Sequence, residues 1–276
     1  MPLPIPELSR RDFQRISTIT RRVAGIDLQA GKEGLVMSRL MRRLVVLGAA
    51  TFDEYVDYVE NDRTGQEMNA MVDALTTNKT SFFREIQHFE YLRDHVVPQL
   101  RESTAPFTVW SAGCSTGQEP YSVALLFNEE LAAANRRHIR ILATDISKRV
   151  LVTAVKGHYE HSQLEGLPPF LMQKYFRRGE DNATLEIADT NVRNMVTFAR
   201  LNLMNNWPMK GLFDLIMCRN VMIYFDQETQ HNVVRRLVAL LRPGGHLFIG
   251  HAETISGNVP DLAYIQPAIY VKRGRE

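Results

Sequence analysis

Short apolar segments alternate with helix-like segments from residue 107 onward, and this alternation restricts the fold more than any other feature of the sequence. The strand-like segments are residues 107–112, 138–143, 195–200, 213–218 and 246–249. A helix is expected from about Pro120, another after Ser147 and a third after Asp226, where a capping residue precedes apolar positions at helical spacing. The alternation predicts an α/β fold with a mainly parallel sheet, whose ligands bind at the carboxyl ends of the strands.

The first 76 residues lack strand patterns and predict a small helical domain. Ser9, followed by Asp12, is typical of a helix start, and Gly25 is typical of its end. Further helices are expected over about 32–47, from Thr51, and around 68–75. We therefore predict a helical domain at 1–76, a linker with a lead-in helix at 77–106, and an α/β domain at 107–276. Residues 158–194 interrupt the alternation and predict a small antiparallel β insertion in that domain.

Composition excludes several classes of protein. The net charge of +2 is too small to indicate a nucleic-acid partner, and no apolar run approaches the roughly 18 residues of a membrane span. The beginning of the chain has no secretory signal pattern, and the two cysteines have no paired spacing. We expect a cytoplasmic protein with no membrane insertion. His158 and His161 lie beside a proline-rich loop with no evident third ligand, so no metal site is predicted.

A nucleotide-type loop follows the first strand. Residues 113–119 read Gly-Cys-Ser-Thr-Gly-Gln-Glu and lack the second and third glycines of the G-x-G-x-x-G pattern that cradles a pyrophosphate. Asp145 ends the next strand, where an acidic residue accepts hydrogen bonds from ribose hydroxyls in nucleotide-binding folds. Taken separately, the loop fits an ordinary strand–helix turn, and Asp145 fits a helix-capping residue. Together they favour a cofactor that contains a nucleoside, without deciding between S-adenosylmethionine (SAM) and NAD.

Five sequence blocks resemble the chemoreceptor glutamate methyltransferases, the CheR family, in order and spacing. They are residues 77–84 (TNKTSFFR), 110–122 (WSAGCSTGQEPYS), 143–146 (ATDI), 202–203 (NL) and 218–225 (CRNVMIYF). The similarity extends over essentially the whole chain. It implies a Rossmann-like SAM-dependent methyltransferase domain preceded by an all-α domain, with SAM as cofactor and S-adenosylhomocysteine as product. Cys114 departs from the alanine or glycine that the family often has, and a cysteine is small enough to fit.

The resemblance implies a set of SAM-binding residues: Asn78, Thr80, Arg84, Glu119, Asp145, Asn202, Leu203, Arg219 and Asn220. A guanidinium such as Arg84 suits the methionine carboxylate, although an exposed helix charge is the simpler interpretation of that position. Glu119 either pairs with the cofactor's ammonium or stabilises the start of its helix. Asn202 has the donor and acceptor that an adenine edge requires.

The implied reaction needs no catalytic base, because a glutamate carboxylate is already ionised at neutral pH. Alignment of the reacting atoms is then the main requirement. Tyr224 and Arg219 are the candidates for positioning the substrate. Two alternatives stay open: a SAM-dependent N-methyltransferase, whose usual Asn/Asp-Pro-Pro-aromatic motif is replaced here by Arg219-Asn220-Val221-Met222, and a non-catalytic, SAM-responsive receptor adaptor.

The implied partner is the cytoplasmic domain of a methyl-accepting chemoreceptor. Lys32, Arg39 and Arg43 share one face of the second predicted helix, and we expect them to contact the glutamate-rich receptor. Some family members also bind a C-terminal receptor peptide along their insertion, and those members tend to have Gly-x-Gly in its turn. This chain has residues 179–183, Gly-Glu-Asp-Asn-Ala, so we expect that the peptide tether is absent.

Overall fold

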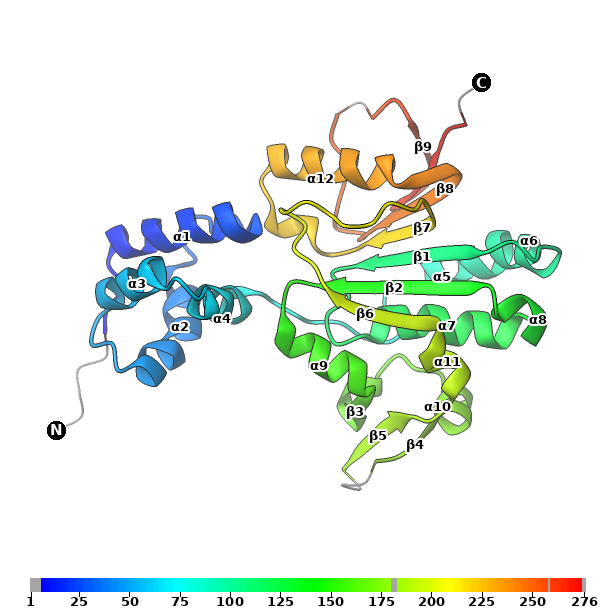
Figure 1. The fold of residues 1–276 in the computed structure, drawn as a ribbon, viewed down its shortest axis with the longest axis horizontal. Coiled ribbons are helices and arrows are strands. Elements are labelled where there is room, and N and C mark those ends of the chain that lie inside the picture. Colours follow the sequence, from blue (N-terminus) through cyan, green and yellow to red (C-terminus); the bar gives the residue numbers. More distant parts are fainter. Residues whose placement is uncertain (1–5, 180–182, 258, 275–276) are drawn as a thin grey trace.

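The computed structural model describes residues 6–179, 183–257 and 259–274. Figure 1 shows a small helical unit beside a larger α/β unit, joined by one extended segment. The helical unit contains α1 (Arg10–Ala24), α2 (Glu33–Leu47), α3 (Phe52–Asn61) and α4 (Gln66–Leu75). Ser9 caps α1 by accepting the Asp12 N–H, Gly25 ends it at φ 72°, and Thr51 caps α3. These helix ends confirm the predicted ones.

The larger unit is built on a seven-stranded mixed sheet of order β6-β2-β1-β7-β8-β10-β9. Its strands are β1 (Phe107–Ala112), β2 (Ile139–Asp145), β6 (Val196–Arg200), β7 (Phe213–Cys218), β8 (Leu241–Ile249), β9 (Leu262–Gln266) and β10 (Ile269–Lys272). The first five pair in parallel, whereas β10 pairs antiparallel with β8 and β9. The chain runs outward from β1 through β2 to β6 and then returns to β7 on the other side of β1. The predicted, mainly parallel α/β fold is therefore confirmed.

Helices cover both faces of this sheet. The helices of this unit are α5 (Gln87–Tyr91), which continues through a π turn (Leu92–Val96) into α6 (Val97–Arg101), then α7 (Gln118–Glu130), α8 (Ala133–Arg136), α9 (Lys148–Lys156), α10 (Pro169–Tyr175), α11 (Thr190–Met195) and α12 (Gln227–Ala239). Alternate strand residues enter two cores: Val109 packs with α7, and Trp110 with α12. Burial on both faces explains the continuous apolar runs of these strands.

A three-stranded antiparallel sheet of order β3-β5-β4 forms the insertion (Figure 1). Its strands are β3 (His158–Glu160), β4 (Phe176–Arg178) and β5 (Thr184–Ile187). The same stretch also contains a 3-10 turn (His161–Leu164), α10 and α11, which the sequence pattern did not predict. Three residues of the predicted turn, 180–182, lie outside the described residues.

Two predicted boundaries are wrong for identifiable reasons. Helix α7 begins at Gln118 rather than near Pro120, because Gly117 at φ 94° already ends the preceding loop. Strand β8 begins at Leu241 rather than at the predicted residue 246, because residues 242–245 lie within it as an irregularity, with Gly244 at φ 78°. Among the described residues, none of the helices has the length and apolar character that crossing a membrane requires.

The end of α1 lies against the loops that follow β6 and β7. Asn202 donates a hydrogen bond from Nδ2 to the Val23 carbonyl over 2.6 Å, and Asp27 donates its N–H to the Tyr224 carbonyl over 2.8 Å. Arg21 forms an ion pair with Asp226, the capping residue of α12. These contacts bring the helical unit to the edge of the sheet where the parallel strands end.

Candidate active site

A pocket lies at the carboxyl ends of β1, β2, β6 and β7, on the side facing the helical unit. All ten residues singled out from the sequence line it: Asn78, Thr80, Arg84, Glu119, Asp145, Asn202, Leu203, Arg219, Asn220 and Tyr224. Five separate segments of the chain contribute them. Ala24 and Ile26 from the helical unit complete one wall. The structure therefore brings every predicted site residue to one place, at the sheet edge that topology favours.

The loop after β1 requires its two glycines. Gly113 and Gly117 have φ values of 85° and 94°, which residues with a Cβ rarely adopt. A Cβ on Gly113 would also lie 2.4 Å from Cγ2 of Val221, so this loop packs directly against the turn after β7. The glycines thus place the start of α7, including Glu119, beside the pocket.

Asp145 links the glycine loop to the start of α9. Its carboxylate accepts the Ser115 N–H from the glycine loop and the Ser147 N–H at the start of α9, each over 2.9 Å. Burial raises the pKa of Asp145, and these backbone hydrogen bonds oppose the rise. The side chain therefore fixes two loops and also contributes to the pocket wall.

A buried arginine connects the opposite wall. Arg219, whose side chain is 2% exposed, bonds through Nη1 to Glu119 over 3.0 Å and through Nη2 to Glu85 over 2.9 Å. Nη2 also donates to the Arg84 carbonyl. Burial raises the pKa of Glu119 despite this pairing. At Glu85 burial acts in the same direction, but the Arg219 charge and the hydrogen bonds from Arg219, Asn220 and the His251 N–H together lower the pKa of its carboxyl group. The guanidinium is thus held by two carboxylates at the pocket wall.

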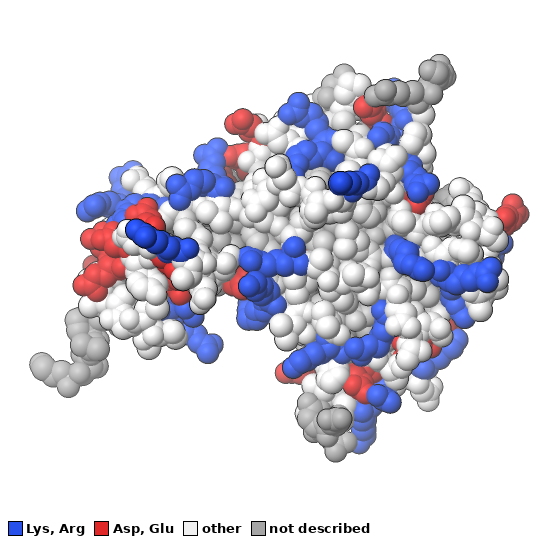
Figure 2. Space-filling view, viewed as in Figure 1, with Lys and Arg blue, Asp and Glu red and all other residues white. Residues whose placement is uncertain are grey.

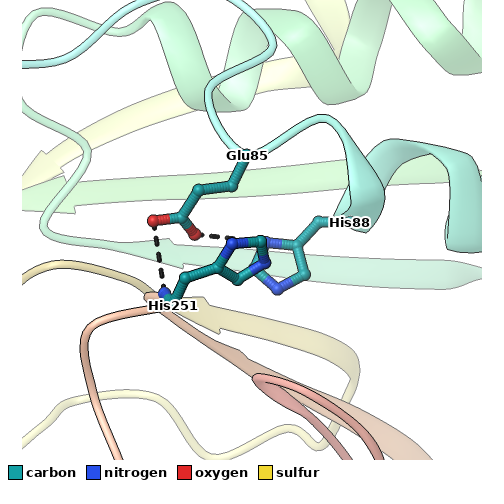
Figure 3. A group of neighbouring side chains, drawn as sticks. All are labelled: Glu85, His88 and His251. Atoms are coloured by element: carbon teal, nitrogen blue, oxygen red, sulfur yellow. Dashed lines mark hydrogen bonds and ion pairs between the residues drawn. The ribbon is translucent and has the colours of Figure 1, made fainter.

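Glu85, His88 and His251 form a second group of ionisable side chains (Figure 3), and Glu85 connects this group to Arg219. One potential ligand atom from each lies within 4.8 Å of the others. Burial, together with the Arg219 charge, lowers the pKa of His88 to about 3, so its contact with Glu85 is not an ion pair at neutral pH. A metal ion would have to compete with the guanidinium for the same Glu85 oxygens. We therefore interpret this group as side chains that hold Arg219 in place through its ion pair with Glu85.

Several predicted ligands have protein partners of their own. The Asn202 amide donates to Val23 and accepts the Met204 N–H over 2.9 Å, so the predicted contact with adenine would have to share or replace these bonds. Arg84 is half-buried and donates to the Lys79 carbonyl over 3.0 Å. Within the described residues it forms no ion pair, which leaves its charge available to a ligand.

Sequence reasoning missed three contributors. Glu85 directly follows the matched segment 77–84 but lies outside it. Glu253 follows strand β8, and the rule that sites lie at the carboxyl ends of parallel strands could have identified it. Ile26 was unpredictable, because nothing in the helical pattern of residues 1–76 shows which end approaches the sheet.

Comparison with known proteins gives a consistent result. The family profile described as "CheR methyltransferase, all-alpha domain" matches residues 11–76, and "CheR methyltransferase, SAM binding domain" matches residues 78–270. The chain is 43% identical over 251 residues to the "Chemotaxis protein methyltransferase" of Escherichia coli strain K12, covering 90% of this chain and 86% of that protein. It is 43% identical over 238 residues to the "Probable chemotaxis protein methyltransferase" of Rhizobium etli, covering 85% and 89%. Identity to the Borreliella burgdorferi "Chemotaxis protein methyltransferase" is 38% over 273 residues, covering 96% and 95%.

Proposed function

The chain belongs to the CheR methyltransferase family, and from this premise we propose that it methylates glutamate side chains in the cytoplasmic region of bacterial chemoreceptors. It is a methyltransferase that uses SAM, and its relatives are named for chemotaxis. The observation that carries the proposal is the convergence of ten predicted residues on one pocket at the sheet edge. The products would be a glutamate methyl ester and S-adenosylhomocysteine.

The pocket has groups suited to each part of SAM. Arg84 offers a guanidinium that has no ion-pair partner among the described residues for the carboxylate, Asp145 a carboxylate for the ribose hydroxyls, and Leu203 an apolar wall for the adenine. SAM supplies an electrophilic methyl group bonded to a sulfonium sulfur. We propose that Asn78, Thr80, Glu119, Asn202, Arg219 and Asn220 complete this binding site.

The chain's own residues have to orient the substrate without holding its charge tightly. A glutamate carboxylate loses its charge in the transition state, so strong ion pairing with it would slow the reaction. Arg219 is already engaged by Glu85 and Glu119, which leaves little of its charge for the substrate. We therefore assign Arg219 to holding the pocket wall and Tyr224, half-buried at the pocket, to positioning the substrate.

An alkali test distinguishes this function from the two alternatives. The full-length protein is incubated with methyl-labelled SAM and a chemoreceptor cytoplasmic fragment, and the labelled fragment is then treated with alkali. A glutamate methyl ester releases its label as volatile methanol. An N-methyl group would keep the label on the protein, and a non-catalytic adaptor would transfer none.

Receptor docking through α2 is a separate proposal. Of the three predicted residues, Arg39 donates to the Leu75 carbonyl and to Thr77, and Arg43 pairs with Glu67, whereas Lys32 is exposed. Figure 2 shows acidic and basic side chains side by side on this unit. Reversing Arg39 or Arg43 would therefore disturb the helical unit itself, which leaves Lys32 as the clean probe.

We predict that Lys32→Glu lowers the rate of receptor methylation by about threefold at low ionic strength, as expected for one exposed charge pair. The difference from wild type should shrink as salt is added, because salt screens exposed charges. Initial rates at subsaturating receptor measure this. Arg63→Glu makes the same charge change on the same unit but outside α2, and serves as the control. An unchanged rate for Lys32→Glu would refute docking at this end of α2.

The absence of a peptide tether is also a proposal. The insertion's edge strands, β3 and β4, span three residues each, and β4 exposes Arg177 and Arg178. Short, charged edges resist the addition of another strand. We expect no binding at micromolar concentrations when the protein is titrated calorimetrically with the C-terminal peptide of a tether-bearing receptor. A micromolar dissociation constant would contradict this expectation.

A further inference from the structure

The turn after β7 carries Asn220 and Tyr224, which line the pocket, yet its backbone is irregular. Asn220 has φ 57°, a left-handed conformation that asparagine adopts more readily than most residues. A 3-10 turn, Met222–Tyr224, follows directly. The backbone N–H groups of such a turn lack the regular partners of a helix or sheet, so something else has to satisfy them.

One carboxylate satisfies two of these groups and a third N–H in the turn after β8. Glu253, only 7% exposed, accepts the Asn220 N–H over 2.9 Å and the Gly250 N–H over 2.6 Å on Oε2. Its Oε1 accepts the Ile223 N–H over 3.2 Å. The side chain thus joins the turn after β7 to the turn after β8 at two points, one on each side of the bend at Asn220.

The space around this carboxylate is tight. A Cβ added to Gly250 would lie 2.5 Å from Nδ2 of Asn220 and 2.9 Å from Oε2 of Glu253. Glu253 itself is not among the residues that line the pocket. It therefore acts on the site through the backbone of the turn.

We propose that Glu253 is a positioning residue for methyl transfer, which holds the turn that presents Asn220 and Tyr224 to the pocket. This inference rests on the proposed function, since Tyr224 is assigned there to the substrate. Glu253→Gln keeps the size of the side chain but replaces one acceptor oxygen with an NH₂ group that faces an N–H donor. The turn would then shift, and displacements of about 1 Å near a reacting centre can cost up to about a hundredfold in rate.

The test compares kcat and KM of the full-length variants with those of wild type, using SAM and a receptor fragment. We expect Glu253→Gln to lower kcat by about ten- to a hundredfold, with KM for the receptor fragment within about twofold of wild type, because Glu253 does not contact the pocket. Glu253→Asp keeps both carboxylate oxygens and should recover part of kcat. The matched control is Asp189→Asn, which weakens the cap of α11 that Asp189 forms with the Val192 N–H.

Each outcome bears on a distinct claim. A wild-type kcat for Glu253→Gln overturns the positioning role. The role is also overturned if Asp189→Asn loses as much kcat as Glu253→Gln for an equal loss of thermal stability. Failure of Glu253→Gln to fold, with no recovery in Glu253→Asp, would make Glu253 a structural cap and overturn it as well. Wild type in the same assay tests the proposed function, because absence of ester formation there would contradict that function whatever the variants do.

Discussion

Replacing Arg219 with alanine is expected to lower the free energy of unfolding by about 3–5 kcal/mol, because it leaves buried charges without their partner. Glu85 and Glu119 both lose the guanidinium that lies between them, in a place where the Arg219 side chain is only 2% exposed. Chemical denaturation at neutral pH measures the change. Methyl transfer should be lost as well, since Glu119 lines the pocket.

The destabilisation caused by Arg219→Ala should decrease as the pH falls. The pKa of Glu85 is lowered in the folded wild-type protein, so its pairing stabilises the fold above the unfolded pKa and is lost as pH falls through the folded one. Burial raises the pKa of Glu119, and without Arg219 both carboxyl groups take up protons more readily. The difference in the free energy of unfolding between wild type and Arg219→Ala should therefore shrink as the pH falls from about 8 to about 4, which is close to the pKa of glutamate in the unfolded chain.

An exposed ion pair provides the control. Arg101 pairs with Glu130 at the surface, with side chains 55% and 28% exposed, and Arg101→Ala should cost less than about 1 kcal/mol. If Arg219→Ala is no more destabilising than Arg101→Ala, the buried cluster does not contribute to stability in the way described.

Arg84→Ala is expected to weaken SAM binding by about ten- to a hundredfold, the loss of one charge-assisted hydrogen bond worth about 1.5–3 kcal/mol. Arg84 lines the pocket and within the described residues has no carboxylate partner, so its removal should weaken ligand binding more than it destabilises the fold. Titration calorimetry with SAM and with S-adenosylhomocysteine measures the change.

Arg93→Ala is the matched control, because Arg93 is a surface arginine of the same segment that pairs with its neighbour Asp94 outside the pocket. It should bind SAM like wild type. Wild-type affinity in Arg84→Ala would mean that residues 78–84 only connect the two units.

Much of the fold was predictable because its signals are local. The Ser9 and Thr51 caps and the terminal glycine of α1 each act within one turn of helix, so a few neighbouring residues specify them. Likewise, the strands of the parallel sheet read as apolar runs because both faces are buried. The matched segments then located the pocket, since the carboxyl ends of parallel strands share one edge.

The remainder depends on contacts between distant parts of the chain. Glu85 contacts Arg219, and Glu253 contacts Asn220, across more than 30 residues of sequence, and no spacing along the chain shows these contacts. Ile26 reaches the pocket only because α1 ends against Asn202 and Tyr224. The partners of Arg39 and Arg43 within the helical unit could not be predicted for the same reason, because Leu75 and Glu67 lie on another helix of that unit.

Locating the transferred methyl group tests the central claim most directly. A receptor cytoplasmic fragment is incubated with SAM and wild-type protein, digested, and sequenced by tandem mass spectrometry before and after mild alkali. We predict that the added mass of one methyl group lies on glutamate side chains, disappears with alkali, and is strongly reduced when Arg84→Ala replaces wild type at limiting SAM. A methyl group on lysine, arginine or another nitrogen, stable to alkali, would contradict the assignment of this pocket to glutamate esterification.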